Sequence, residues 1–321
     1  MTAYIIRRLI QAVPIIMIVS IVGFAIIQAT GDPLAAYTVD SSLTKDDIAR
    51  LRAKYGLDQP VPVQYLNWLK NMLIGDWGRS YYTKMEVKAL VFDWLPNTIL
   101  LAGVSYIMTL SMSTVLGIVT AVRQYSLFDH VITAISFVGI ATPSFWMGLM
   151  LIIVLAVRPK AAGLPYLPVG GMFNPRVGES LPQVVWHVIL PAFTLSFVMT
   201  ASYIRYIRSS VLEELHLDYV RTARSKGLKE RVIFARHVLK NALLPLLTLI
   251  GLSVPSLLSG TIVIEAMFAW PGMGRLFWQA AERVDIPVLM ALLMFVSVMT
   301  VLSSIVTDIL YAAADPRIRY S

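Results

Sequence analysis

Six long apolar runs, separated by polar or charged stretches, constrain the fold of this chain more than any other feature. The runs cover residues 9–30, 97–122, 131–157, 184–204, 242–264 and 287–309. A hydrocarbon core about 30 Å thick needs roughly 20 residues of apolar helix, so each run can cross a bilayer. A 57% hydrophobic and 14% charged composition agrees. The sequence predicts an all-α polytopic membrane protein with six transmembrane helices.

The distribution of basic residues predicts the orientation, because Lys and Arg concentrate in short cytoplasmic loops. Arg7 and Arg8 precede the first run, and a basic cluster covers residues 205–240. Both termini are therefore expected in the cytoplasm. The first run is longer than the roughly 7–15 apolar residues of a secretory signal peptide, so we interpret it as an anchor. The net charge of +8 follows this distribution, and no nucleic acid is expected as a partner.

Four parts follow from these spans. Residues 1–30 form the cytoplasmic N-terminal end and the first transmembrane helix, and residues 31–96 form an extracytoplasmic segment. That segment carries apolar residues at helical spacing, with turns expected at Gly56, Gly75 and Gly78. Residues 97–311 form a five-helix core with an inner loop over 206–241 and an outer loop over 265–286. Residues 312–321 form a cytoplasmic tail.

The chemistry that the chain lacks also limits its function. The six apolar cores contain no Asp, Glu, Lys or Arg, and Asp308 lies only at the inner end of the last run. Ion-coupled carriers usually need an ionisable group at bilayer depth. The sequence has no Cys and no GxxxxGK[ST] loop, so no catalytic residue, metal site or bound cofactor is expected. Any driving energy must come from a partner, although composition alone leaves a secondary carrier as an alternative.

The longest inner loop predicts two short helices. Apolar residues recur at i, i+3 and i+4 up to Ala223, acidic residues come early and basic residues come late, which complements the helix dipole. Gly227 can adopt the positive φ that ends a helix. A helix–Gly–helix unit presents a compact knob that a groove on another protein can receive. A basic loop that only touches anionic lipid is the alternative.

The sequence of this loop resembles the docking loop of ABC importer permeases, whose pattern is EAA-x3-G-x9-I-x-L-P. Arg221, Thr222 and Ala223 stand at the EAA positions, and Gly227 has the required spacing. The string YVRTARSKGL is similar to the B-type permease subunit of dipeptide and oligopeptide (peptide/nickel) importers. The N-terminal MTAYIIRRLIQAVPIIMIVSIVGF, ATPSFWMG, EAMFAWPGMGRLFWQAAERVDIPV and the terminal DPRIRY resemble the same family and span the whole chain.

This resemblance implies the type I importer permease fold in a bacterial or archaeal inner membrane. It implies a second related permease, two cytoplasmic ATPases that hydrolyse ATP with Mg²⁺, and an extracytoplasmic substrate-binding protein. The expected cargo is di- or oligopeptides, with oligosaccharides, glutathione or nickel complexes as alternatives. The expected ATPase-docking residues are Arg221, Thr222, Ala223, Gly227 and Leu228.

Two further groups of residues are candidates for the translocation route. Small and hydroxyl side chains that can line a path, or equally pack helices closely, are Gly139, Thr142, Pro143, Ser144, Ser253, Pro255, Ser256 and Ser259. The outer loop resembles the re-entrant loop of the family and is expected to close the outer mouth, with candidate gate residues Glu265, Trp270, Pro271, Gly272 and Gly274. Glu265 either pairs with a basic group or remains a solvated charge.

Overall fold

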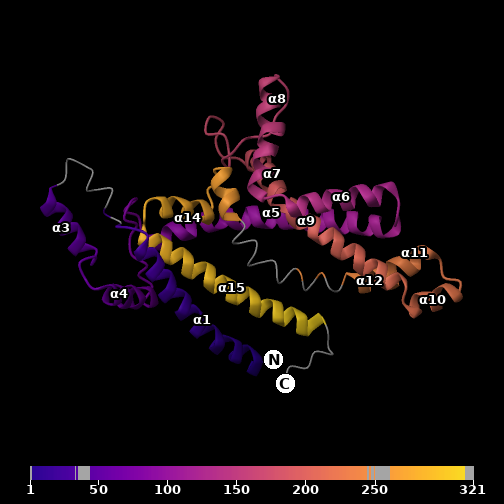
Figure 1. Ribbon diagram of the computed structural model, residues 1–321, viewed down its shortest axis with the longest axis horizontal. Helices are drawn as coiled ribbons and strands as arrows, with labels where there is room; N and C mark the ends of the chain where they lie inside the picture. The colour runs from indigo at the N-terminus through magenta and orange to yellow at the C-terminus, as the bar shows by residue number, and fades with distance from the viewer. Residues whose placement is uncertain are drawn as a thin grey trace. The chain divides into compact units, whose positions relative to one another are not determined.

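The computed structural model describes residues 2–32, 34, 44–243, 246, 249 and 261–314. Over these residues the chain is helical, and its only strand-like feature is one isolated bridge between Arg79 and Glu86 (Figure 1). The helices are α1 Thr2–Ala29, α3 Lys45–Lys54, α4 Val61–Leu73, α5 Val87–Val122, α6 Leu127–Ala141, α7 Ser144–Ile152, η1 Ile153–Val157, α8 Arg158–Ala161, α9 Leu181–Leu215, α10 Asp218–Ser225, α11 Glu230–Ile233, η2 Phe234–Val238, α12 Leu239–Ala242, α14 Met273–Glu282 and α15 Ile286–Ala314.

Within the described residues, five helices are long and apolar enough to cross a membrane. They cover Ile6–Ala29, Val87–Val122, Ser144–Ala161, Leu181–Leu215 and Ile286–Thr307, while α6 is apolar but shorter. Most of the predicted fifth run, residues 242–264, lies outside the described residues. The all-helical, polytopic class predicted from the sequence is confirmed, and the count of six spans stays a prediction.

The chain divides into two compact units, and the boundary falls within α5. The first unit contains the chain up to Asn97 together with Gly272–Ile305. Its core joins the start of α5 to α14 and the start of α15 through Val91, Leu276 and Leu292. Asp285 is buried in this unit and accepts hydrogen bonds from the Ser80 hydroxyl and the backbone N–H groups of Tyr81 and Tyr82.

The segment of the first unit that follows α1, which the sequence predicts to be extracytoplasmic, contains α3 and α4. Thr44 caps α3 in a capping box with Asp47, and Pro60 precedes the first turn of α4. Gly56, Gly75 and Gly78 all have positive φ, which fits the turns expected at these glycines. The helix that carries the second apolar run begins before that run, because α5 starts at Val87 and continues through Pro96.

The second unit is built around α9, which packs against α5 and α6. A Cβ on Gly117 of α5 would lie 2.8 Å from the Cβ of Ile207, and one on Gly139 of α6 would lie 3.0 Å from the Cβ of Ala201. These approaches are closer than larger residues allow, so the two glycines set the packing distance. The resulting core has an inner part around Ile207 and a second part around Phe268 and Trp270.

Two of the helices predicted in this unit have different bounds from the expected ones. The third apolar run, predicted as one helix, breaks between α6 and α7, where Thr142 is extended and Pro143 has no N–H to continue the hydrogen-bond ladder. The fourth run was expected to end at residue 204, but α9 continues to Leu215. The buried side chains of Ile207 and Val211 extend its apolar face into the expected loop.

Candidate functional site

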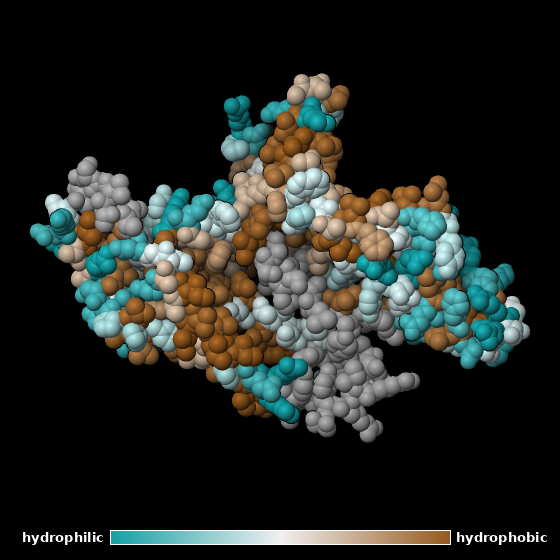
Figure 2. Space-filling model, viewed as in Figure 1, coloured by the Kyte–Doolittle hydropathy of each residue, from teal (hydrophilic) through white to brown (hydrophobic). Residues whose placement is uncertain are grey.

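The candidate site is the inner loop that follows α9. The chain turns at His216 and Leu217, and α10 then begins at Asp218, whose carboxylate lies near the positive N-terminal end of the helix dipole. Val220 and Ala223 on one face of α10 are buried, while most of the other side chains are exposed. Figure 2 shows hydrophilic residues gathered over α10 and α11. The loop is therefore a polar surface fixed by an apolar underside.

The turn after α10 has the geometry expected from its glycine. Gly227 has a φ of +74°, and a Cβ there would meet nothing within 4 Å. The Gly227 N–H donates to the Arg224 carbonyl at 2.9 Å. Across this turn, Arg224 Nε lies 2.8 Å from Glu230 Oε1, and this ion pair joins α10 to the first turn of α11. The predicted arrangement of two short helices around Gly227 is thus present.

Four of the five predicted docking residues are exposed, and one is not. Arg221 and Thr222 lie on the open face of α10, and Leu228 follows Gly227 with 42% of its surface exposed. Ala223 is only 7% exposed and packs into the inner core. Its small side chain supports the knob from beneath, on the packed side of α10 rather than on the exposed face that carries Arg221 and Thr222.

A hydrogen-bonded network holds α10 to the neighbouring helices. The Tyr219 hydroxyl donates to the Glu214 carboxylate at the end of α9, and Asn241 Nδ2 of α12 donates to the same hydroxyl oxygen at 3.2 Å. Burial raises the pKa of Tyr219, and the hydrogen bond to Glu214 adds to this shift. Ser210 Oγ of α9 donates to the Ala242 carbonyl at 2.9 Å, so α9 and α12 are also joined.

A two-point ion pair ties α9 to the turn between α5 and α6. Arg208 Nε and Nη2 donate to the two carboxylate oxygens of Asp129 at 2.8 and 2.7 Å. The same carboxylate accepts the Tyr125 N–H at 3.0 Å, and its side chain is 4% exposed. Sequence reasoning counted Arg208 as one member of the basic cluster and missed this pair. The available signal was Asp129, an acidic residue just before an apolar run.

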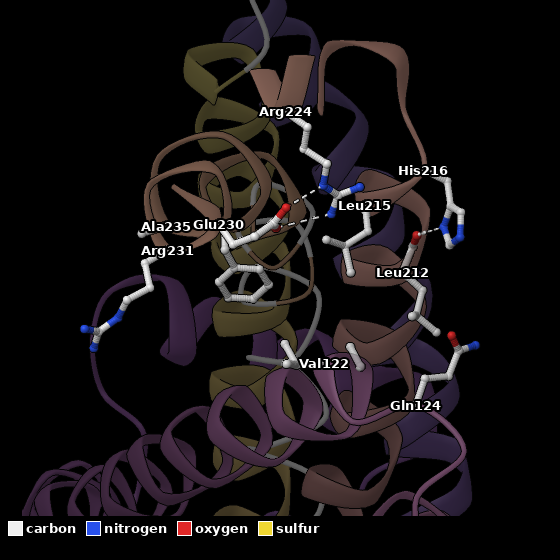
Figure 3. Close-up of a pocket in the computed structure, with 11 residues that line it drawn as sticks. Val122, Gln124, Leu212, Leu215, His216, Arg224, Glu230, Arg231 and Ala235 are labelled. Atoms are coloured by element: carbon white, nitrogen blue, oxygen red, sulfur yellow. Dashed lines mark hydrogen bonds and ion pairs between the residues drawn. The ribbon is translucent and has the colours of Figure 1, made fainter. Parts of the chain in front are cut away.

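A hollow of about 780 Å³ opens beside the loop (Figure 3). In the close-up, Arg224 and Glu230 face each other, with Leu215 and Leu212 beside them. Val122 of α5 and Phe234 of η2 supply further apolar lining. The hollow brings together the end of α5, the end of α9 and the segment after Gly227. The end of α5, with Gln124, and the inner loop thus lie on the same side of the second unit.

Of the described residues of the predicted path, Gly139 packs between helices, while Thr142, Pro143 and Ser144 lie at the break between α6 and α7. Gly139 is buried between α6 and α9, where its hydrogen atom faces Ala201 and Phe197. The Thr142 hydroxyl donates to the Val138 carbonyl at 2.6 Å, and Pro143 and Ser144 begin α7. These contacts favour close helix packing for Gly139. Ser253, Pro255, Ser256 and Ser259 lie outside the described residues.

The predicted gate residues belong to two different units. In the second unit, Glu265 is fully buried and accepts a hydrogen bond from Thr98 Oγ1 at 2.8 Å, so a solvated charge is wrong for this residue. Trp270 is fully buried, and its backbone N–H donates to the backbone carbonyl of Glu265 at 2.9 Å. Pro271 is half-buried. In the first unit, Gly272 caps α14 and Gly274 lies in its first turn, both buried.

Sequence comparisons match the whole chain to membrane transport proteins. Residues 113–320 match the family described as binding-protein-dependent transport system inner membrane component. Residues 1–102 match the corresponding N-terminal family of these membrane components.

Individual relatives match over their full lengths. The oligopeptide transport system permease protein AppB of Bacillus subtilis is 43% identical over 322 residues, covering 100% of both chains. A putative peptide permease protein of Brucella suis is 38% identical over 99% of both chains. The dipeptide transport system permease protein DppB of Escherichia coli is 33% identical over 337 residues, covering 100% of this chain and 99% of the relative.

Proposed function

Because the chain belongs to the family of binding-protein-dependent transport system inner membrane components, we propose that it is the permease subunit of an ATP-driven peptide importer. It crosses the inner membrane several times and forms half of the translocation path. A second, related permease forms the other half. Two cytoplasmic ATPases bind and hydrolyse ATP with Mg²⁺, and an extracytoplasmic binding protein delivers the peptide. Both termini lie in the cytoplasm.

The observation that carries this proposal is the exposed α10–Gly227 knob held rigidly on the end of α9. Its exposed residues Arg221, Thr222, Gly227 and Leu228 form the surface that docks an ATPase subunit. Val220 and Ala223 fix that surface to the inner core of the second unit. An ATPase movement at the knob therefore moves the helices beneath it rather than bending a loose loop.

The force reaches the membrane through α9. This helix runs without a break from Leu181 to Leu215, so the residues that meet the knob and the residues within the apolar span belong to one rigid element. Closure of two ATPases draws two such knobs together and tilts the attached helices. The path then opens to one side at a time, which is a rigid-body form of alternating access.

Peptides are the proposed cargo because the named relatives are peptide, oligopeptide and dipeptide permeases that match along the whole chain. Apart from Asp308 at the inner end of the last run, the apolar runs contain no Asp, Glu, Lys or Arg, so the route does not select cargo by side-chain charge. Selection among peptides then rests with the binding protein. Oligosaccharides, glutathione and nickel complexes are the competing cargoes within this importer class.

The test is transport by the complete complex, purified with its co-expressed partners and reconstituted in vesicles. Mass spectrometry identifies the co-purifying subunits, and ATP-dependent accumulation of a labelled oligopeptide is measured with the binding protein present. We expect unlabelled peptides to compete and an oligosaccharide, glutathione and a nickel chelate to leave uptake unchanged. If only the oligosaccharide, glutathione or the nickel chelate competes, the chain is still an importer permease, but its cargo is that compound and not a peptide. Purification of the chain without an ATPase would contradict the importer itself.

A further inference from the structure

The extracytoplasmic helix α4 has three distinct faces, and one of them is apolar and mostly exposed. Tyr65 and Trp68 point toward α1, and the polar face carries Asn67 and Asn71. Between these faces runs a third, apolar stripe with i, i+4, i+7, i+11 spacing, formed by Pro62, Leu66, Leu69 and Leu73. Leu66 is 61% and Leu73 is 79% exposed.

The contacts of the packed face determine how far α4 lies from the end of α1. The Tyr65 hydroxyl is 2.9 Å from the hydroxyl of Ser20, which is completely buried. The Phe24 ring packs against both Tyr65 and Trp68, with ring centroids 5.5 and 6.2 Å apart. One turn further along α1, Gln28 Nε2 donates to Gln64 Oε1 at 3.1 Å. Thus α4 is attached along the last three turns of α1 (Figure 1).

That attachment places α4 at membrane depth. At 1.5 Å per residue, Ser20 lies roughly 13 Å from the end of α1 at Ala29. The apolar span Ile6–Ala29 is about 36 Å long by the same rise, only slightly longer than a hydrocarbon core of about 30 Å. Ser20 and Phe24 therefore lie within the outer part of the hydrocarbon, and a helix bonded to them cannot lie out in bulk water.

We propose that α4 is an interfacial helix whose Leu66–Leu73 stripe inserts into the outer leaflet of the bilayer beside α1. Its composition fits this location. Lys70, the one charged residue of α4, is exposed between the apolar stripe and the polar face, where its amine can reach a lipid phosphate. Tyr65 and Trp68 are residue types that concentrate at membrane interfaces. The neighbouring surface of α1, including Val22 and Ile26, is exposed and apolar as well.

The consequence is that the extracytoplasmic segment does not stand free above the membrane. An amphipathic helix with its apolar face in the interface is held at a fixed depth and orientation. The polar face of α4, together with Trp77 and Tyr81, lines a hollow of about 460 Å³ on the side away from the stripe. When the stripe contacts lipid, the hollow on the opposite side of α4 therefore faces water.

The experiment labels the unmodified, complete complex in vesicles that contain a phospholipid with a photoreactive diazirine near the headgroup end of its acyl chain. We expect lipid adducts on Leu66 and Leu73 and none on Asn67 or Asn71, as mapped by mass spectrometry of peptides from this chain. Cleavage after Lys70 places Leu66 and Leu73 in different peptides, so the two positions are read separately.

A second measurement uses the absence of cysteine from the chain. Single variants Leu66→Cys and Leu73→Cys are compared with Asn67→Cys and Asn71→Cys for reaction with a membrane-impermeant maleimide, read on the band of this chain. We expect the two stripe positions to react at least about tenfold more slowly, because the reagent stays in water. Equal reaction rates overturn the proposal, since the stripe then faces water. Slow reaction without lipid adducts also overturns it, since another protein subunit then covers the stripe.

Discussion

Arg208 on α9 holds Asp129 at the start of α6 by two parallel N–H to O contacts of 2.8 and 2.7 Å. The pair lies two turns before the end of α9, next to the segment that carries the docking knob. Because both oxygens of a nearly buried carboxylate are bound, the geometry resists rotation as well as separation. The turn between α5 and α6 is thereby made to move with α9 and the knob.

Replacing Asp129 with Asn should both destabilise the chain and loosen this link. The substitution removes the negative charge and turns one of the two oxygens that accept from Arg208 into an NH2 donor facing the guanidinium, which costs about 2 kcal/mol in free energy of unfolding. We expect a lower midpoint of thermal unfolding for the purified complex and more ATP hydrolysed per peptide imported. The matched control is Asp218→Asn. Its ion pair with Arg221 spans 3.7 Å between side chains that are 95% and 80% exposed, so the midpoint should not move.

Gly227→Trp should abolish ATP-driven uptake while Gly227→Ala retains most of it. Both substitutions place a Cβ at a φ of +74°, which costs about 1 kcal/mol. Only Trp adds bulk to the exposed docking surface. Uptake and membrane insertion are measured for both variants. Normal uptake by the Trp variant would remove Gly227 from the docking surface, and equal loss in both variants would assign the effect to backbone strain.

The helical class and most spans could be predicted from apolar run length, but several boundaries could not. Lys88, Asp93 and Pro96 interrupt residues 87–96 and keep this stretch out of the predicted apolar run. Val87, Leu90 and Val91 are nevertheless buried against α14 and α15, and this tertiary packing extends α5 toward its N-terminus. In α9 the same effect acts through Ile207 and Val211. The break at Thr142 was visible in the sequence as Pro143, but a proline alone does not distinguish a kink from an interruption.

Part of the candidate site could likewise be predicted from the sequence. Gly227 carries its own conformational signal, so the turn was correctly placed. The inward position of Ala223 and the pairing of Asp129 with Arg208 depend on which helix faces meet, and residues about 79 positions apart give no local signal of this. The burial of Glu265 depends in the same way on Thr98, far away in the chain.

Asp285→Ala should loosen the segment around Ser80, Tyr81 and Tyr82 in the first unit. The carboxylate accepts from Ser80, Tyr81 and Tyr82, and its removal leaves buried donors without their acceptor, at a cost of about 2–3 kcal/mol. We expect protease cleavage between residues 76 and 86 to become faster. Asp76→Ala is the control, because Asp76 accepts only an exposed bond from the Gly78 N–H. Equal cleavage of both variants would contradict the role of Asp285.

Gly139→Val should lower the stability of the chain and leave its peptide selectivity unchanged. A Cβ at this position already meets Ala201 at 3.0 Å and Phe197 at 3.1 Å, so the larger side chain forces α6 from α9 at a cost of about 1–3 kcal/mol. Gly103→Val in α5, where a Cβ meets nothing within 4 Å, is the matched control and should unfold normally. An unchanged unfolding midpoint with altered peptide selectivity for Gly139→Val would instead place Gly139 on the path.

Site-specific cross-linking from the α10–Gly227 knob in the complete complex tests directly whether this chain docks an ATPase subunit. A photoreactive maleimide is attached to Thr222→Cys in this cysteine-free chain, with Leu164→Cys in the connection between α8 and α9 as the control. We expect illumination to cross-link Thr222→Cys to a subunit that contains a P-loop ATPase sequence. We expect no such product from Leu164→Cys. Cross-links from Thr222→Cys to lipid alone, with no ATPase captured, would contradict ATPase docking at this knob.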